Sequence, residues 1–472
     1  HIGGARTALF NWLFAKKHNG KLVLRIEDTD TERLKEDSVS QILTSLKWLG
    51  LNWDEGPEVG GEVGPYYQSE RREIYSKVAE QLLEEGKAYY CFCTSEILEA
   101  EREKQRAAKQ PFRYARTCRD LPVEEAKARA AKGEPYSVRI KIPTEGNLTV
   151  HDLIHGDVTF DLTQFDDFVI VKTNGMPTYN FAVVVDDHLM RISHVLRAEE
   201  HLSNTPKQVL LYEACGFAVP KFGHMPMILA PDRSKLSKRH GATSVEEFRE
   251  QGYLPEAIVN YLTLLGWAPG NEEEIFSLQD TVAQFELEKM SKKAAVYDTK
   301  KLTWMNGQYL SALPLEAVLP EAKIFFIKSG LVDEAWLEAN KDYFSRLVDV
   351  VRVRVKTLQE VVEAAEYFFK EVESYDEKGV GKHFKPEAAE LLTVCINALE
   401  ALETFDLAST EAAYNKIAEE QGLSLGKVVH PTRLALTGRT VSPGLFDVMV
   451  LLGKETTLSR MRKAVQYIKA LA

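Results

Sequence analysis

The chain has 472 residues, a formal net charge of −11 at pH 7, and 44% hydrophobic residues. This length exceeds one ordinary core and predicts about two to four domains. No apolar run of about 18 residues occurs, which excludes a membrane-spanning helix. The negative balance argues against a protein coated with nucleic acid, although a local basic face can still bind it.

The first fifty residues read as helix, strand and helix. Apolar residues recur at helical spacing in residues 5–17, and residues 21–27 form an apolar run typical of a buried strand. Helical spacing returns in residues 31–49, which Gly50 follows as a C-cap. This alternation predicts a parallel sheet with crossover connections. Because no strand precedes the first helix, we expect one strand upstream of residue 1.

Residues 73–175 change in character, and we interpret them as an inserted module. We expect a helix over residues 70–86 and a strand over residues 137–142, with a basic segment between them. β-rich patterns then resume at residues 167–172 and 178–186, where we expect strands.

The remainder of the chain completes an α/β layer and then becomes helical. We expect a strand over residues 193–197, a helix over 206–215 and a strand over 224–229. Further helices are expected over residues 255–266 and 298–310, and an all-α region over 313–472. The sequence contains no low-complexity tract and no repeat of fixed period.

Two short strings could bind a nucleotide. His-Ile-Gly-Gly at residues 1–4 opens the first helix, where free N–H groups and the positive end of the helix dipole favour phosphate. Lys-Leu-Ser-Lys-Arg at residues 235–239 forms a basic loop that could neutralise charge developing on a leaving pyrophosphate. Taken alone, the first string is equally explained by chance and the second by a solvated basic turn.

Together, the two strings resemble the signature sequences of the class I aminoacyl-tRNA synthetases, which are a His-Ile-Gly-His-like helix start and a Lys-Met-Ser-Lys-Ser-like loop. Within that class, the chain is similar to the bacterial glutamyl-tRNA synthetases over essentially its whole length. The segments that carry the similarity are residues 1–7, 24–30, 48–56, 177–180, 184–187, 195–201 and 235–241.

The resemblance implies an α/β architecture with a helical C-terminal part. Residues 1–72 and 176–240 would form a Rossmann-like parallel-sheet catalytic domain, and residues 73–175 an inserted α+β module for the tRNA acceptor stem. Residues 241–312 would form a helical stem-contact region, and residues 313–472 an all-α anticodon-binding region.

The resemblance also implies the reaction and its participants. Glutamate attacks the α-phosphate of Mg²⁺-ATP, and the resulting glutamyl-adenylate passes its glutamyl group to the 3′ end of tRNA(Glu). The family implies a cytoplasmic enzyme that is usually monomeric. Whether tRNA(Gln) is also charged stays open at this point.

Specific positions follow from the resemblance, residue by residue. The ATP-binding residues would be His1, Gly3, His201, Lys235, Leu236, Ser237, Lys238 and Arg239, and the catalytic ones among them His1, Lys235 and Lys238. The glutamate pocket would be lined by Glu27, Tyr179, Val183 and Arg197, since a dicarboxylate needs an arginine and its amino group an acid. The chain departs from the family pattern at Gly4, Leu236, Arg239 and Val183, where the family has His, Met, Ser and in some relatives Asn.

Contacts with tRNA are expected at three places. The acceptor end would face Asp28, Thr29, Asp30 and Arg33. The basic run of residues 102–119, with seven Lys or Arg and one acidic residue, would contact phosphates through Arg113 and Arg116. From composition alone, this run could equally be a solvated helix and loop. In the helical C-terminal part, Arg352 and Arg354 suit unpaired bases or phosphates.

Five cysteines do not suggest a disulfide framework, but three of them lie close enough in sequence to consider together. Cys91, Cys93, Cys118 and Asp120 resemble a zinc site found in part of the family, with Asp120 where relatives have His. A structural Zn²⁺ accepts such ligands. The alternative is that three reduced thiols pack beside aromatic side chains.

Two other functions are weighed against the active enzyme. One is an inactive relative retained as a tRNA-binding protein, against which the chain keeps Glu27, Arg197, Lys235, Ser237 and Lys238. The other is a shorter relative that glutamylates a modified tRNA base, against which residues 313–472 argue.

Overall fold

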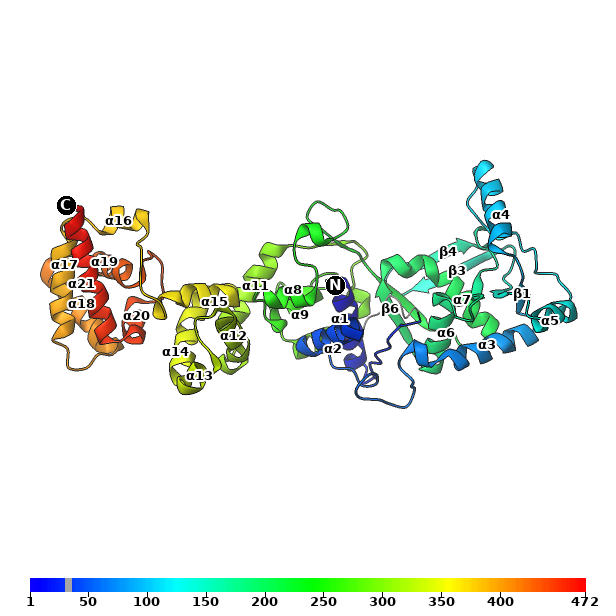
Figure 1. The fold of residues 1–472 in the computed structure, drawn as a ribbon, viewed down its shortest axis with the longest axis horizontal. Coiled ribbons are helices and arrows are strands. Elements are labelled where there is room, and N and C mark those ends of the chain that lie inside the picture. The colour runs from blue at the N-terminus through cyan, green and yellow to red at the C-terminus, as the bar shows by residue number, and fades with distance from the viewer. Residues whose placement is uncertain (30–35) are drawn as a thin grey trace. The chain divides into compact units, whose positions relative to one another are not determined.

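The structure is a computed structural model, and it describes residues 1–29 and 36–472. The chain divides into two units (Figure 1). The first comprises residues 1–246 and 259–298, and the second residues 247–258 and 299–472. Among the described residues, no helix is long and apolar enough to cross a membrane.

The larger sheet of the first unit has the strand order β4-β3-β7-β6. Its strands are β3 (Asn147–Asp152), β4 (Gly156–Asp161), β6 (His194–Ala198) and β7 (Lys221–Met225). β6 and β7 run parallel, and α7 (Thr205–Cys215) connects them as a crossover. Pro206 lies in the first turn of α7, and Gly216, at φ +72°, ends it. A parallel pair with a crossover connection is thus present at residues 194–225, but residues 21–27, from which a parallel sheet was predicted, do not belong to this sheet.

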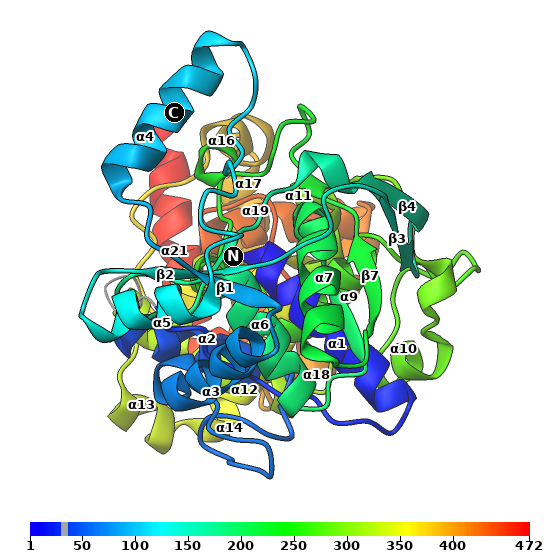
Figure 2. The same ribbon diagram turned by 90° about the vertical axis from the view of Figure 1, so that its right-hand side faces the viewer.

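Helices cover this sheet with their apolar faces. α1 (Ile2–Lys17) packs against β6. α6 (Tyr179–Leu189) lies beside α7 (Figure 2), and α7 contacts β3. α2 (Glu36–Trp48) agrees with the second predicted helix over its described part. The predicted strand at residues 21–27 is extended but forms only isolated parallel bridges, from Val23 to Glu55 and from Ile26 to Tyr67.

The expectation of a strand at residues 178–186 was wrong, because these residues form α6. Every residue from Phe181 to Asp187 is buried. A helix that is buried on all sides shows no apolar stripe, so its short apolar run resembles a buried strand.

A second, antiparallel sheet has the order β1-β2-β5. It consists of β1 (Ala88–Cys91), β2 (Ser137–Ile140) and β5 (Val169–Val171), and the helices around it are α3 (Arg72–Glu84), α4 (Ser95–Ala107) and α5 (Val123–Ala131). The helix predicted at residues 70–86 and the strand at 137–142 are confirmed. Tyr75 of α3 and Ile140 of β2 share one buried core with Phe181 of α6 and Phe222 of β7.

Shorter elements follow the larger sheet. They are β8 (Ile228–Leu229), β9 (Ala295–Val296), α8 (Val245–Glu250), α9 (Pro255–Thr263) and α10 (Leu278–Gln284). β8 and β9 pair in parallel. The strand predicted over residues 224–229 is thus divided between β7 and β8.

The described part of the second unit is helical, as predicted. Its helices are α11 (Thr299–Ala312), α12 (Leu315–Ser329), α13 (Glu334–Ala339), α14 (Lys341–Val351), α15 (Leu358–Ala365), α16 (Glu377–His383), α17 (Ala388–Glu400), α18 (Leu407–Gln421), α19 (Leu425–Thr437), α20 (Leu445–Leu452) and α21 (Lys454–Leu471). One core includes Phe326, Phe344 and Val361, and another includes Leu392, Tyr414 and Met461.

Candidate active site and metal site

The N-terminus of α1 is built to receive an anion. The His1 side chain caps the helix, because its Nδ1 accepts a hydrogen bond from the N–H of Gly3 at 3.0 Å. This bond leaves the Nε2 of His1 to carry the ring proton. No acidic residue lies in the first turn of α1, and a Cβ at Gly4 would meet nothing within 4 Å. The N–H of Ile2 donates to the carbonyl of Thr243 at 2.7 Å, so the first turn offers a ligand the N–H of Gly4 and the open space beside it.

Arg6 fixes this helix end to the rest of the first unit. Its side chain is buried and donates to the backbone carbonyls of Leu265, at 2.8 Å, and Pro226. Burial lowers the pKa of Arg6 to about 10. Arg6 was not predicted as a site residue, because the carbonyls that it contacts are more than 200 residues away in the chain.

The basic loop, residues 235–239, buries the side chain of Leu236 and exposes its two lysines. Leu236 is buried, and Ser237 caps a single 3₁₀ turn, Lys238–His240, whose His240 Nδ1 accepts from the N–H of Ser237 at 3.1 Å. Lys235 is exposed, with its Nζ 3.7 Å from Glu200. Lys238 is also exposed, and no ion pair to it is found among the described residues. The lysines of the loop are therefore held near solvent.

Two pockets adjoin at this end of the sheet. Pocket A, of 520 Å³, lies between the start of α1 and the basic loop, and pocket B, of 390 Å³, lies beside it. They share Gly4, Thr7 and Arg197 in their walls. The predicted ATP residues that line pocket A are His1, Gly3, His201, Lys235 and Leu236. Ser237, Lys238 and Arg239 continue the loop beyond its wall.

Pocket B brings together the four residues expected to bind glutamate, which are Glu27, Tyr179, Val183 and Arg197. Arg197, on β6, is 9% exposed. Its Nε donates to His224 Nε2 at 3.0 Å, its Nη1 to Gln208 Oε1 at 2.8 Å, and its Nη2 to Thr205 Oγ1 at 2.9 Å.

All three of these side-chain acceptors are uncharged groups, and no carboxylate of the described chain forms an ion pair with Arg197. Burial lowers the pKa of Arg197. A buried guanidinium without a carboxylate partner is unfavourable unless a ligand supplies the negative charge.

The lining of pocket B also contains Arg25 and two acidic residues, Glu27 and Asp187. This arginine pairs with Glu27 at 3.0 Å and with Asp187 at 2.8 Å. Its neighbour Asp186 is fully buried and held by Arg71 at 2.6 Å. Burial raises the pKa of Asp187. Arg25 was not predicted as a site residue. The consecutive aspartates Asp186 and Asp187 within the apolar helix α6 could have indicated a buried cation partner.

The residues expected to face tRNA differ in their surroundings. Asp28 accepts hydrogen bonds from the N–H and Oγ of Ser69, at 2.9 and 2.7 Å. Thr29 is partly exposed, whereas Asp30 and Arg33 lie outside the described residues.

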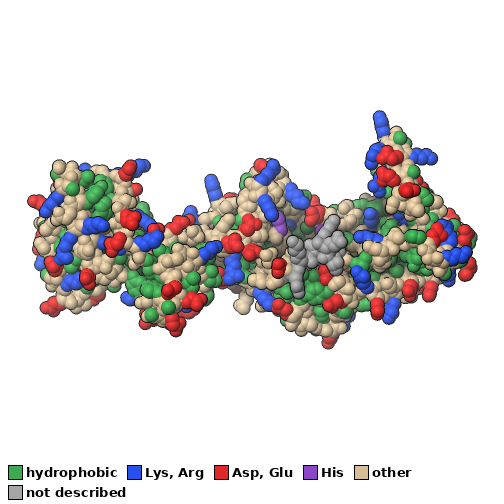
Figure 3. All heavy atoms as spheres, in the orientation of Figure 1, with side chains coloured by type: hydrophobic (Ala, Val, Ile, Leu, Met, Phe, Trp, Pro, Cys, Tyr) green, Lys and Arg blue, Asp and Glu red, His purple; other side chains and the backbone are tan. Residues whose placement is uncertain are grey.

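The basic run is partly tied down by contacts within the first unit. Arg113 donates to the carbonyl of Thr163, and Arg116 donates to that of Phe165 at 3.2 Å. Three exposed basic residues of the run, Arg102, Lys104 and Arg106, lie on α4 among acidic ones, and exposed Lys109 follows that helix (Figure 3).

In the second unit, Arg352 is buried and Arg354 is exposed. The guanidinium of Arg352 is buried against the carbonyls of Leu310 and Leu313, at 3.2 and 2.5 Å. Arg354 is exposed and donates to the carbonyl of Ser442 at 3.2 Å.

Arg433 reaches the same Ser442, donating to its Oγ at 2.9 Å. Nearby, Arg439 stacks over the ring of Tyr367, and the rings of His383 and His430 lie 5.1 Å apart. We call Arg354, Arg433 and Arg439 the cationic cluster. Within the described chain, none of them forms an ion pair. Sequence spacing could not reveal the cluster, because its members come from separate elements.

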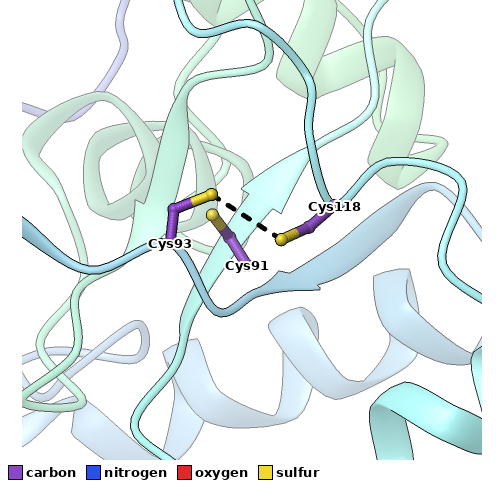
Figure 4. Close-up of side chains that lie close together, drawn as sticks. All are labelled: Cys91, Cys93 and Cys118. Carbon is purple, nitrogen blue, oxygen red and sulfur yellow. Dashed lines mark hydrogen bonds between the residues drawn. The ribbon is translucent and has the colours of Figure 1, made fainter. Parts of the chain in front are cut away.

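Three cysteines of the smaller sheet region converge (Figure 4). The sulfur atoms of Cys91, Cys93 and Cys118 all lie within 4.8 Å of one another. The hydroxyl of Tyr114 lies 3.3 Å from the Cys91 sulfur and 3.6 Å from that of Cys93. Asp120 is exposed, and its carboxylate does not belong to this group.

Residues 1–304 match the family of class I tRNA synthetases for E and Q, catalytic domain, and residues 316–465 match the anticodon binding domain family. The pockets and this match define the catalytic domain of a class I tRNA synthetase. The chain is 55% identical to a glutamate–tRNA ligase of Moorella thermoacetica and 53% identical to glutamate–tRNA ligase 2 of Caldicellulosiruptor saccharolyticus, with 99% of this chain and 96% of each relative covered.

A crystal structure of a glutamate tRNA ligase from Elizabethkingia meningosepticum in complex with its amino acid is similar at a TM-score of 0.88 and 37% identity. The alignment covers 99% of this chain and 97% of that one. The chain belongs to the glutamate–tRNA ligase family.

Proposed function

We propose that this protein attaches L-glutamate to the 3′ end of tRNA(Glu) at the expense of ATP, through a glutamyl-adenylate. The observation that carries the proposal is the junction of the two pockets. Pocket A begins at a helix N-terminus with no acidic residue in its first turn and at a basic loop, whereas pocket B contains a buried guanidinium without a carboxylate partner. A triphosphate and a carboxylic acid would therefore meet at Gly4 and Arg197.

In pocket A, the proposed ligand is ATP, which arrives with Mg²⁺. His1 would donate from Nε2 to a phosphoryl oxygen, Gly3 and Gly4 would admit the phosphates to the helix end, and His201 would contact the nucleotide. Lys235 and Lys238 would stabilise the charge that develops on pyrophosphate as it leaves. Arg6 would keep the helix end in place.

In pocket B, the proposed ligand is glutamate. Arg197 would bind a carboxylate through its planar fork, and Glu27 would lie near the ammonium group. Tyr179 and Val183 would line the pocket around the methylene groups. The α-carboxylate of the substrate itself attacks the α-phosphate, so the protein contributes position and electrostatics and needs no nucleophilic side chain.

For tRNA, we propose the division of labour that the resemblance implies, with the acceptor stem on residues 73–175, stem contacts on 241–312 and the anticodon on 313–472. Residues 1–72 and 176–240 would hold the catalytic pockets. We propose exposed Arg354 for the anticodon, together with Arg433 and Arg439, because exposed and partly exposed cations without acidic partners suit phosphates and unpaired bases. Arg352 would support Arg354 through its buried carbonyl contacts.

We also propose a structural Zn²⁺ on Cys91, Cys93 and Cys118. Three convergent sulfurs fit zinc, and the hydroxyl of Tyr114 is better placed than Asp120 to complete a tetrahedral set. Burial raises the pKa of Cys93 to about 12, so this thiol stays protonated unless a cation binds it. The metal would tie β1 to the segment that carries Cys118, and it would take no part in the reaction.

The experiment that tests this function is glutamate-dependent ATP–pyrophosphate exchange by the full chain in the presence of tRNA(Glu). We expect exchange with L-glutamate and none with L-glutamine or without amino acid. Tight tRNA binding without any exchange would instead identify an inactive tRNA-binding relative. We further propose that the enzyme acts as a cytoplasmic monomer, which sedimentation and cell fractionation would check.

A further inference from the structure

A buried chain of three side chains lies behind pocket B, one from each of three adjacent strands. Arg197 on β6 donates from Nε to His224 Nε2 on β7 at 3.0 Å, and His224 Nδ1 lies 2.5 Å from Asp152 Oδ2 at the end of β3. Arg197 and His224 are register partners across the parallel pair β6–β7. Asp152 and His224 are both fully or almost fully buried, at 4% and 0% exposure.

The chemistry of the chain fixes the tautomer of His224. The Nε of an arginine can only donate, so His224 Nε2 must accept. The ring proton is therefore on Nδ1 and is donated to Asp152. The other oxygen of Asp152 accepts from the backbone N–H groups of Ile154, His155 and His224, at 3.0, 2.9 and 3.2 Å.

Asp152 is held in its ionised form by these contacts. Burial opposes ionisation, but the hydrogen bonds from His224 and from the backbone at residues 154 and 155 hold the pKa of Asp152 below its ordinary value. Ionised Asp152 therefore polarises the neutral imidazole of His224, which makes its Nε2 a better acceptor for the Arg197 guanidinium. This guanidinium forms no ion pair with a carboxylate of the described chain.

We propose that Asp152 and His224 are positioning residues for glutamate binding, which set the plane of the Arg197 guanidinium and support its charge. This inference rests on the proposed role of Arg197 in pocket B. Gln208 and Thr205 accept from the two Nη atoms, and His224 is the side chain that accepts from Nε, so its loss would free that edge of the guanidinium.

The sharpest test is Asp152→Asn. The asparagine oxygen can keep the three backbone N–H bonds, which leaves its amide group facing His224 Nδ1. His224 must then accept at Nδ1 and carry its proton on Nε2, so two donors face each other at Arg197. We expect the KM for glutamate to rise about 10- to 100-fold, as for the loss of a hydrogen bond to a charged group. We expect the KM values for ATP and tRNA to stay within about twofold.

Two changes at His224 test the same idea without altering Asp152. Glutamine in His224→Gln can accept from Arg197 with its oxygen and donate to Asp152 with its amide, so it should keep the KM for glutamate near the wild-type value. His224→Leu removes both bonds and should raise this KM as Asp152→Asn does. If Asp152→Asn fails to fold, the difference in the KM for glutamate between His224→Gln and His224→Leu tests the positioning role.

A matched control lies on the neighbouring hairpin. His151 and Asp157 form an exposed Asp–His pair at 2.6 Å between β3 and β4, outside both pockets. Asp157→Asn makes the same chemical change there and should leave the KM values for glutamate and ATP unchanged, because Asp157 lines neither pocket.

The outcomes separate the inference from its premise. If Arg197→Met leaves the KM for glutamate unchanged, the proposed role of Arg197 fails. If Arg197→Met raises this KM but Asp152→Asn and His224→Leu do not, only the positioning role fails. Equal increases in the KM values for glutamate, ATP and tRNA, with a lower melting temperature, would show that Asp152 and His224 merely stabilise the fold.

Discussion

At the scale of single residues, the proposed site contains cations that have no carboxylate partner among the described residues. Arg197 is buried with uncharged side-chain partners, and Lys238 is exposed beside a turn that Ser237 and His240 hold in place. In both cases the chain supplies a cation and leaves its anion to a ligand. We propose that this pattern underlies specificity in pocket B and electrostatic stabilisation in pocket A.

The basic loop gives the first prediction. Lys238→Ala should lower the rate constant of glutamate-dependent ATP–pyrophosphate exchange by about 100- to 1,000-fold, because one donor to the developing charge is lost. The KM for glutamate should change little, since Lys238 lies outside the wall of pocket B. Lys16→Ala, an exposed lysine at the far end of α1, serves as the control. An exchange rate within threefold of wild type for Lys238→Ala would remove Lys238 from the mechanism.

Residues that line the pockets were easier to predict from the sequence than the buried residues that contact them. Glu27, Tyr179, Val183 and Arg197 line one pocket, and each stands in a segment that resembles the family. Arg6, Arg25 and His224 escaped notice, because their importance arises from contacts with residues far away in the chain. For Arg6 and His224, no local pattern in the sequence indicates these contacts, whereas the consecutive aspartates of α6 do indicate the network of Arg25.

At the scale of elements, periodicity predicted most helices and failed where burial removed it. α1, α3 and α7 have the residues that were expected of them. α6 was mistaken for a strand, because its apolar run is buried on every side. The run at residues 21–27 looked like a full strand, yet it pairs only at Val23 and Ile26.

The smaller sheet and its cysteines give the second prediction. Purified protein should contain about one zinc per chain, and Cys118→Ser should abolish zinc binding and lower the melting temperature, because the metal links separate segments. Tyr114→Phe should weaken zinc binding about tenfold or more, whereas Asp120→Asn should not change it. Metal analysis and zinc competition with a chelator measure both. Loss of zinc from Asp120→Asn with full retention in Tyr114→Phe would reverse the proposed ligand assignment.

At the scale of the whole molecule, each unit carries a different part of the function. The first unit holds the two pockets, and the second holds the cationic cluster on a helical scaffold. The chain has a net charge of −11, so a binding site for tRNA must be local.

The cationic cluster gives the third prediction. Arg354→Ala and Arg433→Ala should each raise the KM for tRNA(Glu) about tenfold, and each should reduce the salt dependence of tRNA binding. The KM values for glutamate and ATP should stay the same at saturating tRNA. Arg462→Ala, which removes an exposed arginine paired with Glu400 at 2.8 Å, is the matched control. Equal effects from Arg462→Ala and Arg433→Ala would show that the cluster has no special role.

The most direct measurement is the charging of purified tRNA by the full chain with labelled amino acids. The account predicts that tRNA(Glu) is charged with L-glutamate, that L-glutamine and L-aspartate are not attached, and that Arg197→Met abolishes charging at low glutamate. A parallel reaction with tRNA(Gln) establishes whether the anticodon contacts admit it. Failure to charge tRNA(Glu) with glutamate, or equal charging with glutamine, would contradict the assignment of pocket B.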